Sequence, residues 1–352
     1  MLSTRSKKAL MPEAKLHKLP LSGPLRLESG NLLENVTIAY QTFGQLSPEK
    51  DNVIWVFHAL TANSNPLEWW PGLVGQDCLF NPDDHFIICA NMLGSCYGST
   101  GATDINPETG KKFGTDFPDI AIGDIVTTLQ ELKKHLGIST IKCGIGGSMG
   151  GQQLLEWAVR EPELFELIIP VATNARHSPW GIAFNAAQRM ALEADVSFFD
   201  YTADAGQKGL QAARAIGMLS YRNQETFNRT QQGKRADSDK FSADSYQRYQ
   251  GEKLAQRFDA HAYYTLSKTM DSHDIGRNYD SAEAALRRIK SNVLAIGITS
   301  DILFPVAEQE FIARHCLRGK FTSLDSLYGH DGFLIETEKL TQIIEPFLVH
   351  QR

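Results

Sequence analysis

The 352-residue sequence lacks the features of several protein classes. Its five cysteines form no C-x-x-C pair, which argues against a zinc knuckle or a dithiol redox motif. No apolar run approaches the roughly 20 residues of a membrane helix, and none follows the basic residues 1–8 to make a secretory signal. The net charge of −6 gives no overall positive field for nucleic acid. We therefore expect a cytoplasmic protein with no membrane or nucleic-acid partner and no metal.

The sequence does contain alternating strand and helix patterns. Apolar runs typical of strands occur at 36–44, 52–58, 86–91, 167–172 and 292–298. A helical pattern covers 122–136, and further helices are expected at 305–315 and 333–349. Strand, helix and strand in this rhythm predict an α/β fold with a mostly parallel central sheet and helices on both faces. Residues 19–33 predict an edge hairpin, and 321–327 a last strand.

One long segment interrupts this rhythm. Between about residues 174 and 287 the strand patterns disappear and helical spacing dominates, with an exposed polar stretch at 223–244. An all-helical segment between two strands predicts a cap, or lid. The expected organisation is a flexible tail at 1–15, a core formed by 16–173 and 288–352, and a helical cap at 174–287. The long glycine-rich loop at 93–119 is expected to form the rim of an active site.

The most informative stretch is Gly-Gly-Ser-Met-Gly-Gly at 146–151. It lies between an apolar run and a helix-forming sequence, which is the setting of a nucleophile elbow with Ser148 at its tip. The four glycines remove side chains that would collide with the packed strand and helix. The N–H of Met149, at the helix N-terminus, can point at a developing oxyanion. A glycine-rich turn with an incidental serine is the alternative.

A serine nucleophile needs a base and an orienting acid, which follow it in the order acid, then histidine, in this type of site. Asp301 and His330 each follow a predicted strand, where such residues must lie. We assign Asp301 as the orienting acid and His330 as general base and acid; a helix N-cap and a plain loop histidine are the alternatives. His58 precedes the elbow and is better placed to support the oxyanion loop, for which we choose Leu60 as the second N–H donor.

Longer motifs carry a resemblance to a known family. The segments that match it span nearly the whole chain: His58-Ala59-Leu60-Thr61, Trp69-Trp70-Pro71-Gly72-Leu73, Gly101 with Ile105-Asn106-Pro107-Glu108-Thr109-Gly110, Asp116-Phe117-Pro118, Gly146 to Gly151 with Glu156-Trp157-Ala158, Ala175-Arg176-His177-Ser178, Tyr249-Gln250-Gly251-Glu252-Lys253 and Gly329-His330-Asp331. With them, the chain resembles the homoserine O-acyltransferases of the α/β-hydrolase superfamily, which make O-acetylhomoserine for methionine synthesis.

The resemblance implies a reaction and a set of binding residues. Acetyl-CoA, as co-substrate with no permanently bound cofactor, would acylate Ser148, and L-homoserine would then take the acetyl group. Arg214 would bind the homoserine carboxylate and Asp331 its amino group, with Tyr221 and Thr61 also contacting substrate. Seven residues are two helical turns, so Arg214 and Tyr221 would share a helix face. The family also suggests a homodimer formed through the cap.

The sequence departs from the family pattern near the substrate entrance. Gly94-Ser95-Cys96 stands where Gly-Gly-Cys is expected, Ala102 replaces a common proline, and Ala62-Asn63 replaces Gly-Asp. Several alternatives therefore stay open. They are a succinyl donor, a serine acceptor, an esterase that uses the same three residues, and a binding protein without catalysis.

Overall fold

The structure, a computed structural model, describes residues 15–349. Residues 1–14 of the predicted tail lie outside the described part of the chain. An eight-stranded sheet forms the centre, in the order β1-β4-β6-β5-β7-β8-β9-β10. Its strands are β1 (His17–Pro20), β4 (Thr37–Phe43), β5 (Val53–Phe57), β6 (Phe86–Ala90), β7 (Ile141–Gly147), β8 (Phe165–Val171), β9 (Asn292–Ile298) and β10 (Gly319–Leu324).

Most of the sheet is parallel, as predicted. The pairs from β6 through β5, β7, β8 and β9 to β10 are all parallel, and only β4 pairs antiparallel with β6 and with β1 at the edge. The central strand β5 has no exposed residue because both of its faces are covered. Its side chains alternate between two apolar clusters, with Trp55 on one face and Ile54 on the other.

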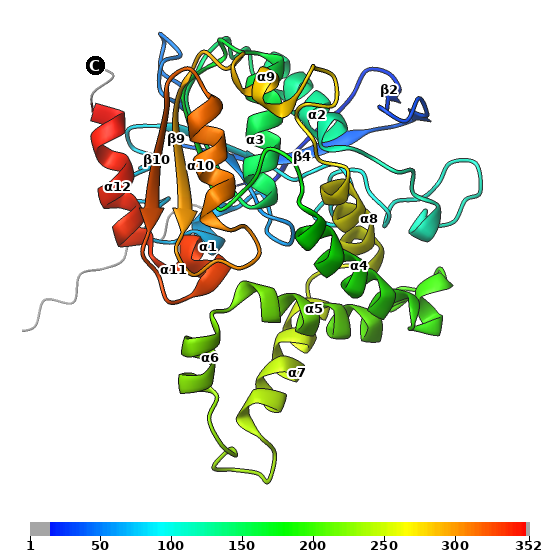
Figure 1. Ribbon diagram of the computed structural model, residues 1–352. Coiled ribbons are helices and arrows are strands. Elements are labelled where there is room, and N and C mark those ends of the chain that lie inside the picture. The colour runs from blue at the N-terminus through cyan, green and yellow to red at the C-terminus, as the bar shows by residue number, and fades with distance from the viewer. Residues whose placement is uncertain (1–14, 350–352) are drawn as a thin grey trace, which may run out of the picture.

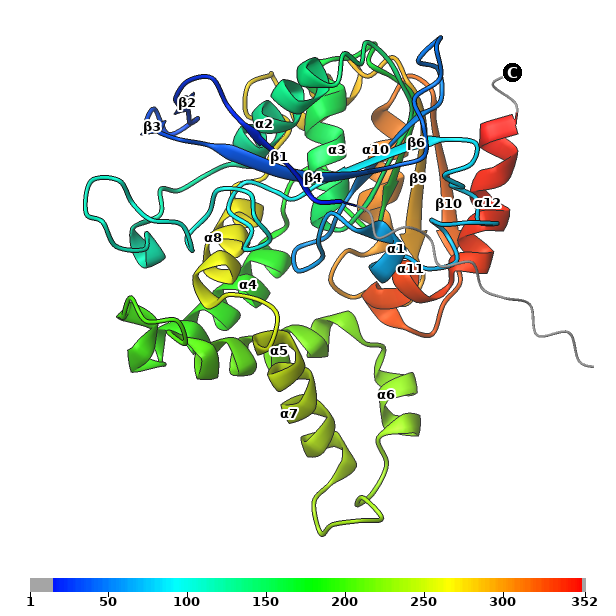
Figure 2. The same cartoon turned by 180° about the vertical axis from the view of Figure 1, so that it is seen from behind.

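Helices cover both faces of the sheet (Figures 1 and 2). On one side lie α2 (Ile122–His135), α3 (Met149–Arg160), α9 (Ala282–Leu286) and α10 (Val306–His315), which supply buried residues to the cluster that contains Trp55. On the other side α12 (Thr337–Val349) packs with Leu340 and Ile344 on the cluster that contains Ile54. The α/β fold class is confirmed.

A group of helices lies apart from the sheet, below it in Figure 1. We call α4 (Pro179–Glu193), α5 (Gln207–Tyr221), α6 (Gln224–Thr230), α7 (Ser242–Ala255) and α8 (Ala260–Asp271) the cap helices. The two chain segments that connect the cap helices to the core lie side by side and are joined by an antiparallel β-bridge between Arg176 and Asp274. The polar stretch at 223–244 is largely exposed, as predicted. The predicted cap limits, 174 and 287, stay predictions.

Two local expectations need correction. The edge hairpin at 19–33 is a separate two-stranded sheet of β2 (Leu25–Arg26) and β3 (Leu32–Leu33), and the edge strand is β1. The predicted helix at 333–349 is broken into α11 (Gly332–Ile335) and α12, because Glu336 leaves the helical conformation. In both places the hydrophobic pattern of the sequence continues although the backbone changes direction, so the pattern alone does not reveal the change.

The prediction of an active-site rim at 93–119 stays a prediction, because this loop lies outside the lining of the cavity described below. It packs instead against the cap helices and the turn between α7 and α8. Tyr97 stacks edge-on against Phe258 and accepts a hydrogen bond from Arg257, while Asp119 pairs with Lys268 on α8. The loop therefore fastens the cap to the core.

Candidate active site

Ser148 lies at the turn between β7 and α3 with φ of 56° and ψ of −127°. This conformation is strained for a residue with a side chain, and neighbouring strands hold it in place. The Ser148 N–H donates to Val171 O at 3.0 Å, and the Thr173 hydroxyl donates to Ser148 O at 2.7 Å. The turn therefore presents the serine at the carboxyl edge of the sheet.

The glycines around Ser148 are required by close packing, as the sequence predicted. A Cβ atom on Gly150 would lie 2.2 Å from Phe57 O, and one on Gly147 would lie 2.5 Å from the Phe333 ring. Gly146 and Gly151 are equally crowded, by Gly150 and Thr173. No side chain fits at these positions without moving the sheet or the elbow helix α3.

The structure brings His330 and Asp301 together. His330 lies in a short 3-10 helix (Gly329–Asp331) after β10, and Asp301 follows β9. His330 Nδ1 is 2.7 Å from Asp301 Oδ2, while Asp301 Oδ1 accepts the N–H groups of Leu303 and Phe304 at 2.8 and 3.0 Å. The loop after β9 therefore fixes the carboxylate, which in turn holds the imidazole with Nδ1 turned away from the cavity. Asp301 does not cap α10, since Pro305 occupies that position.

Aromatic rings surround His330. Phe304 stacks on the imidazole at 5.1 Å, Phe333 meets it edge-on at 5.5 Å, and Tyr221 of the cap lies 5.8 Å away. Burial alone would lower the pKa of His330, but the adjacent Asp301 carboxylate raises it, with a further contribution from Asp331. The net effect is a raised pKa.

A cavity of about 400 Å³ lies between the sheet edge and the cap helices. Seven of the predicted site residues line it: Leu60, Thr61, Ser148, Arg214, Tyr221, His330 and Asp331. Asp301 lies behind His330 and Met149 is fully buried beneath Ser148, so neither reaches the cavity surface. The residues chosen from sequence thus converge on one cavity, although the roles assigned to them stay predictions.

The loop after β5 carries Leu60, one of the two predicted oxyanion-hole donors. Within residues 15–349 the N–H groups of Leu60 and Met149 have no hydrogen-bond acceptor. His58 is fully buried, and its Nε2 accepts the Met92 N–H at 3.2 Å, so its Nδ1 donates to Ala59 O at 2.9 Å. Burial lowers the pKa of His58 to about 4, which keeps the ring neutral. His58 therefore fixes the peptide that carries the Leu60 N–H.

The cap side of the cavity is cationic. The Arg214 guanidinium lies over the Tyr221 ring at 5.1 Å, as two residues on one helix face should. Asp331 pairs with Arg222 at 3.4 Å and makes no capping hydrogen bond to α11. Lys253 and Arg257 add two more positive charges to the cavity wall. The arrangement suits a ligand with a carboxylate or other anionic groups.

Sequence reasoning missed several lining residues, of which His177 is the most informative. It is buried in the cavity wall, and it follows β8 as Asp301 follows β9. The rule that catalytic residues gather at strand ends could have found it. Asn185, Gln188 and Arg257 come from the cap, where no local spacing marks them, whereas His177 and Lys253 lie in segments that carry the family resemblance.

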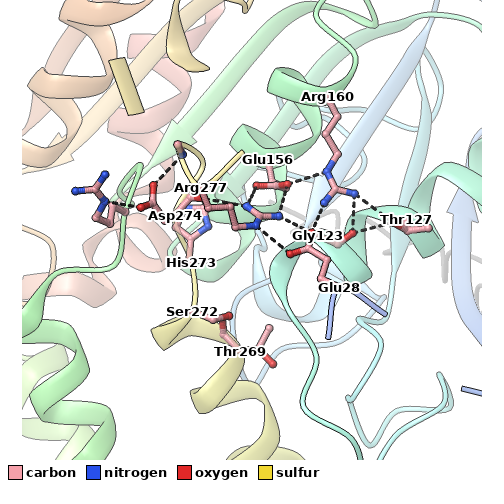
Figure 3. Close-up of polar contacts among 12 residues, drawn as sticks. Glu28, Gly123, Thr127, Glu156, Arg160, Thr269, Ser272, His273, Asp274 and Arg277 are labelled. Carbon is pink, nitrogen blue, oxygen red and sulfur yellow. Dashed lines mark hydrogen bonds and ion pairs between the residues drawn. The ribbon is translucent and has the colours of Figure 1, made fainter. Parts of the chain in front are cut away.

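Behind the elbow helix lies a group of four charges, shown in Figure 3. Arg277, which follows α8, donates to Glu156 on α3 at 2.7 Å and to Glu28 at 2.5 and 2.9 Å. Arg160 on α3 bonds the same two carboxylates at 2.7 and 2.5 Å. Burial would raise the pKa of Glu156, but Arg277 and Arg160 lower it. This cluster fastens the return from the cap to the helix that begins at the nucleophile.

Within the described residues, 15–349, no group of three or more His, Cys, Asp or Glu side chains could hold a metal ion. In the same part of the chain, no helix is long and apolar enough to cross a membrane.

Comparison with known proteins gives four findings. The family model of the alpha/beta hydrolase fold matches residues 52–337. A homoserine O-acetyltransferase of Cyclobacterium marinum is 51% identical over 323 residues, which cover 92% of each chain. Among solved structures, homoserine O-acetyltransferase from Bacillus anthracis superposes with a TM-score of 0.87 at 25% identity over 96% of this chain and 98% of the other. Esterase E22 has the same TM-score at 22% identity, over 96% of this chain and all of the other, which shows the shared fold alone.

Proposed function

This chain belongs to the homoserine O-acetyltransferases of the alpha/beta hydrolase fold, and on that premise we propose that it moves an acetyl group from acetyl-CoA to the hydroxyl of L-homoserine. The transfer proceeds in two half-reactions through acetyl-Ser148. The observation that supports it best is the single cavity in which Ser148 and His330 meet Arg214 and Asp331.

In the first half-reaction Ser148 is acetylated. Because His330 Nδ1 faces Asp301, Nε2 is the nitrogen free to take the serine proton. Ser148 Oγ attacks the thioester carbonyl, and the Leu60 and Met149 N–H groups stabilise the oxyanion. The intermediate then expels the CoA thiolate, which takes the proton from His330 Nε2.

In the second half-reaction homoserine enters the emptied cavity. The Arg214 guanidinium holds the homoserine carboxylate through charge-assisted hydrogen bonds, and Asp331 accepts hydrogen bonds from the homoserine ammonium group. Nε2 of His330 removes the proton of the homoserine hydroxyl, whose oxygen attacks the acetyl-Ser148 carbonyl. Ser148 Oγ leaves and regains the proton from His330, which restores the enzyme.

Transfer instead of hydrolysis requires that water be kept away from acetyl-Ser148. The cap helices supply one wall of the cavity, and Trp69 supplies part of another. Trp69 is held by a 2.9 Å hydrogen bond to Asn63 O and stacks on the buried Trp70. Lys253 and Arg257 are candidate contacts for anionic groups of the donor.

The test is to mix the protein with acetyl-CoA, with and without homoserine, and to follow free thiol and O-acetylhomoserine. Thiol release in excess of one equivalent should require homoserine and should match the ester formed. Thiol release that does not depend on homoserine would indicate that the protein is a hydrolase. A parallel series with succinyl-CoA and with L-serine separates the remaining donor and acceptor alternatives, and size-exclusion chromatography with light scattering tests the homodimer that the family suggests.

A further inference from the structure

Arg257 reaches from the cap to the loop that carries the Leu60 N–H. It lies in the turn between α7 and α8, and its Nη1 donates to Thr61 O at 2.5 Å and to Tyr97 OH at 2.8 Å. Within residues 15–349 these are its hydrogen bonds, and it forms no ion pair there. The positive charge of Arg257 is therefore directed at the backbone of the loop after β5 and is not neutralised by a carboxylate.

The acceptor, Thr61 O, belongs to a tight turn. The turn runs from Ala59 to Ala62, and the Ala62 N–H donates to Ala59 O at 3.0 Å. A trans peptide carries its oxygen and its N–H on opposite sides. The peptide between Thr61 and Ala62 therefore accepts from Arg257 at one side and donates to Ala59 O at the other. The peptide between Ala59 and Leu60 accepts that bond and presents the Leu60 N–H on its far side.

These two peptides form a series that begins at a guanidinium and ends at an N–H without an acceptor among the described residues. We call the peptides Thr61–Ala62 and Ala59–Leu60 the peptide relay. Hydrogen bonds in series polarise one another, and a charged donor strengthens the first of them. His58 Nδ1 also donates to Ala59 O, at 2.9 Å, but its neutral ring adds direction without charge.

The position of Arg257 is itself fixed. Tyr97, which accepts from the same Nη1, meets the buried Phe258 edge-on at 5.7 Å. Tyr97 O accepts from Asn91 Nδ2 at 2.9 Å, and Asn91 Oδ1 accepts the Ser64 N–H at 2.8 Å. Since Ser64 lies further along the loop after β5, the turn of the cap is connected to this loop at a second point as well.

We propose that Arg257 is a positioning residue for the oxyanion hole, and that it orients and polarises the Leu60 N–H through the peptide relay. The inference rests on the proposed acetylation of Ser148, in which negative charge develops on the carbonyl oxygen of the donor. It gives the cap a part in the chemical step, because the hole is complete only while the turn between α7 and α8 lies against the loop. Direct contact of Arg257 with anionic groups of the donor is the competing role.

The p-nitrophenyl acetate burst separates these roles, because this donor has no anionic group. Arg257→Met keeps the length of the side chain and removes its charge, and the side chain is exposed, so the fold should tolerate the change. The burst rate should fall about 5- to 20-fold, less than the roughly 10²- to 10³-fold cost of removing an oxyanion-hole donor outright. Lys268→Met, which breaks another contact between cap and core, should keep the wild-type rate. An unchanged burst in Arg257→Met, or an equal loss in Lys268→Met, would overturn the proposal.

A thionoester shows whether the loss arises in the oxyanion hole. Sulfur is a weaker hydrogen-bond acceptor than oxygen, so O-(4-nitrophenyl) thionoacetate gains less from the Leu60 and Met149 N–H groups. Arg257→Met should therefore slow the ester more than the thionoester, and the ratio of the two burst rates should shrink. A structural disturbance that displaces Ser148 or His330 would slow both substrates alike, and an unchanged ratio would refute the relay.

The amide signals of the relay give a test that requires no activity. In 1H–15N spectra of the full-length protein labelled on alanine and leucine, assigned with Ala62→Gly and Leu60→Met variants, the Ala62 and Leu60 signals should move upfield in Arg257→Met. Both should stay in place in Lys268→Met. A Leu60 signal that does not move would mean that the effect of Arg257 ends before this peptide, and it would overturn the proposal. Absence of any burst in the wild type refutes the proposed function and leaves the amide test standing.

Discussion

Nδ1 of His330 lies 2.7 Å from Oδ2 of Asp301, and both side chains are almost completely buried. The carboxylate is itself held by the Leu303 and Phe304 N–H groups, so it cannot turn away from the imidazole. This pair fixes one tautomer of His330, with Nε2 available in the cavity, and it raises the pKa of the ring. Both consequences can be measured.

Asp301→Asn should reduce the acetylation rate of Ser148 by about 10³- to 10⁴-fold, because the asparagine amide favours the wrong tautomer of His330. Acetylation needs neutral His330, so wild-type activity should fall as pH drops through a value above 6.5. The measurement is the p-nitrophenyl acetate burst over a pH series. Asp325→Asn is the matched control, since Asp325 also follows a strand, but its carboxylate accepts the Thr299 hydroxyl and its backbone oxygen accepts Lys339. An equal loss in both variants would contradict the assignment.

Arg214→Ala should raise the homoserine KM about 10- to 100-fold, since a charge-assisted hydrogen bond contributes roughly 1.5–3 kcal/mol. The burst with p-nitrophenyl acetate should change little. An acceptor without a carboxylate, 3-aminopropan-1-ol, sharpens the test: the wild type should prefer homoserine strongly, and the variant should not. Arg248→Ala, on the exposed side of α7, serves as control. If the preference for homoserine survives in Arg214→Ala, another group binds the carboxylate.

The sequence was sufficient to predict the sheet, the elbow and the triad candidates because each is encoded locally. Ser148 sits in a glycine motif, while Asp301 and His330 each follow an apolar strand in a known order. The predicted strands at 52–58 and 86–91 appear as β5 and β6 for the same reason, since continuous apolar runs are typical of buried parallel strands.

What could not be predicted depends on contacts between distant residues. Glu28 and Arg277 bond each other across 249 positions, and neither carries a local signal. Asn185 on α4 and Gln152 on α3 likewise meet at His177, although nothing in their spacing marks this contact before folding. The contacts of the loop at 93–119 could not be predicted from its pattern either. Its glycines and length resemble those of an active-site rim, but its aromatic and charged side chains contact the cap.

Stability should rise with pH between about 4.5 and 6.5. Burial lowers the pKa of His58, His177 and His273 to about 4. On unfolding, these side chains therefore bind protons that they do not bind in the folded state. Each contribution is complete above the unfolded pKa of about 6.5 and is lost as pH falls toward 4. Glu308, with its raised pKa, acts in the opposite direction over the same window. The net uptake of about two protons corresponds to a slope of about 3 kcal/mol per pH unit.

Urea unfolding at several pH values measures this slope directly. His273→Gln should reduce it by about 1.4 kcal/mol per pH unit, the contribution of one proton, whatever its effect on absolute stability. His135→Gln, on an exposed position of α2, should leave the slope unchanged. A His273→Gln slope equal to that of the wild type would mean that His273 accepts a proton in the folded state.

In the charge cluster behind the elbow helix, the effects of two substitutions on stability should not add, as for a buried ion pair. Glu156 is 5% exposed and Arg277 is 22% exposed, so removing either leaves a partly desolvated charge that only Arg160 or Glu28 can compensate. Arg277→Met or Glu156→Leu should each lower the free energy of unfolding by about 2–4 kcal/mol. The double variant should lose less than the sum, because the two apolar side chains can contact each other. Arg235→Ala, which breaks an exposed pair with Asp237, should leave the urea midpoint unchanged. Losses that simply add would show that the bond between Glu156 and Arg277 contributes nothing of its own, and that the return from the cap is held to α3 by packing.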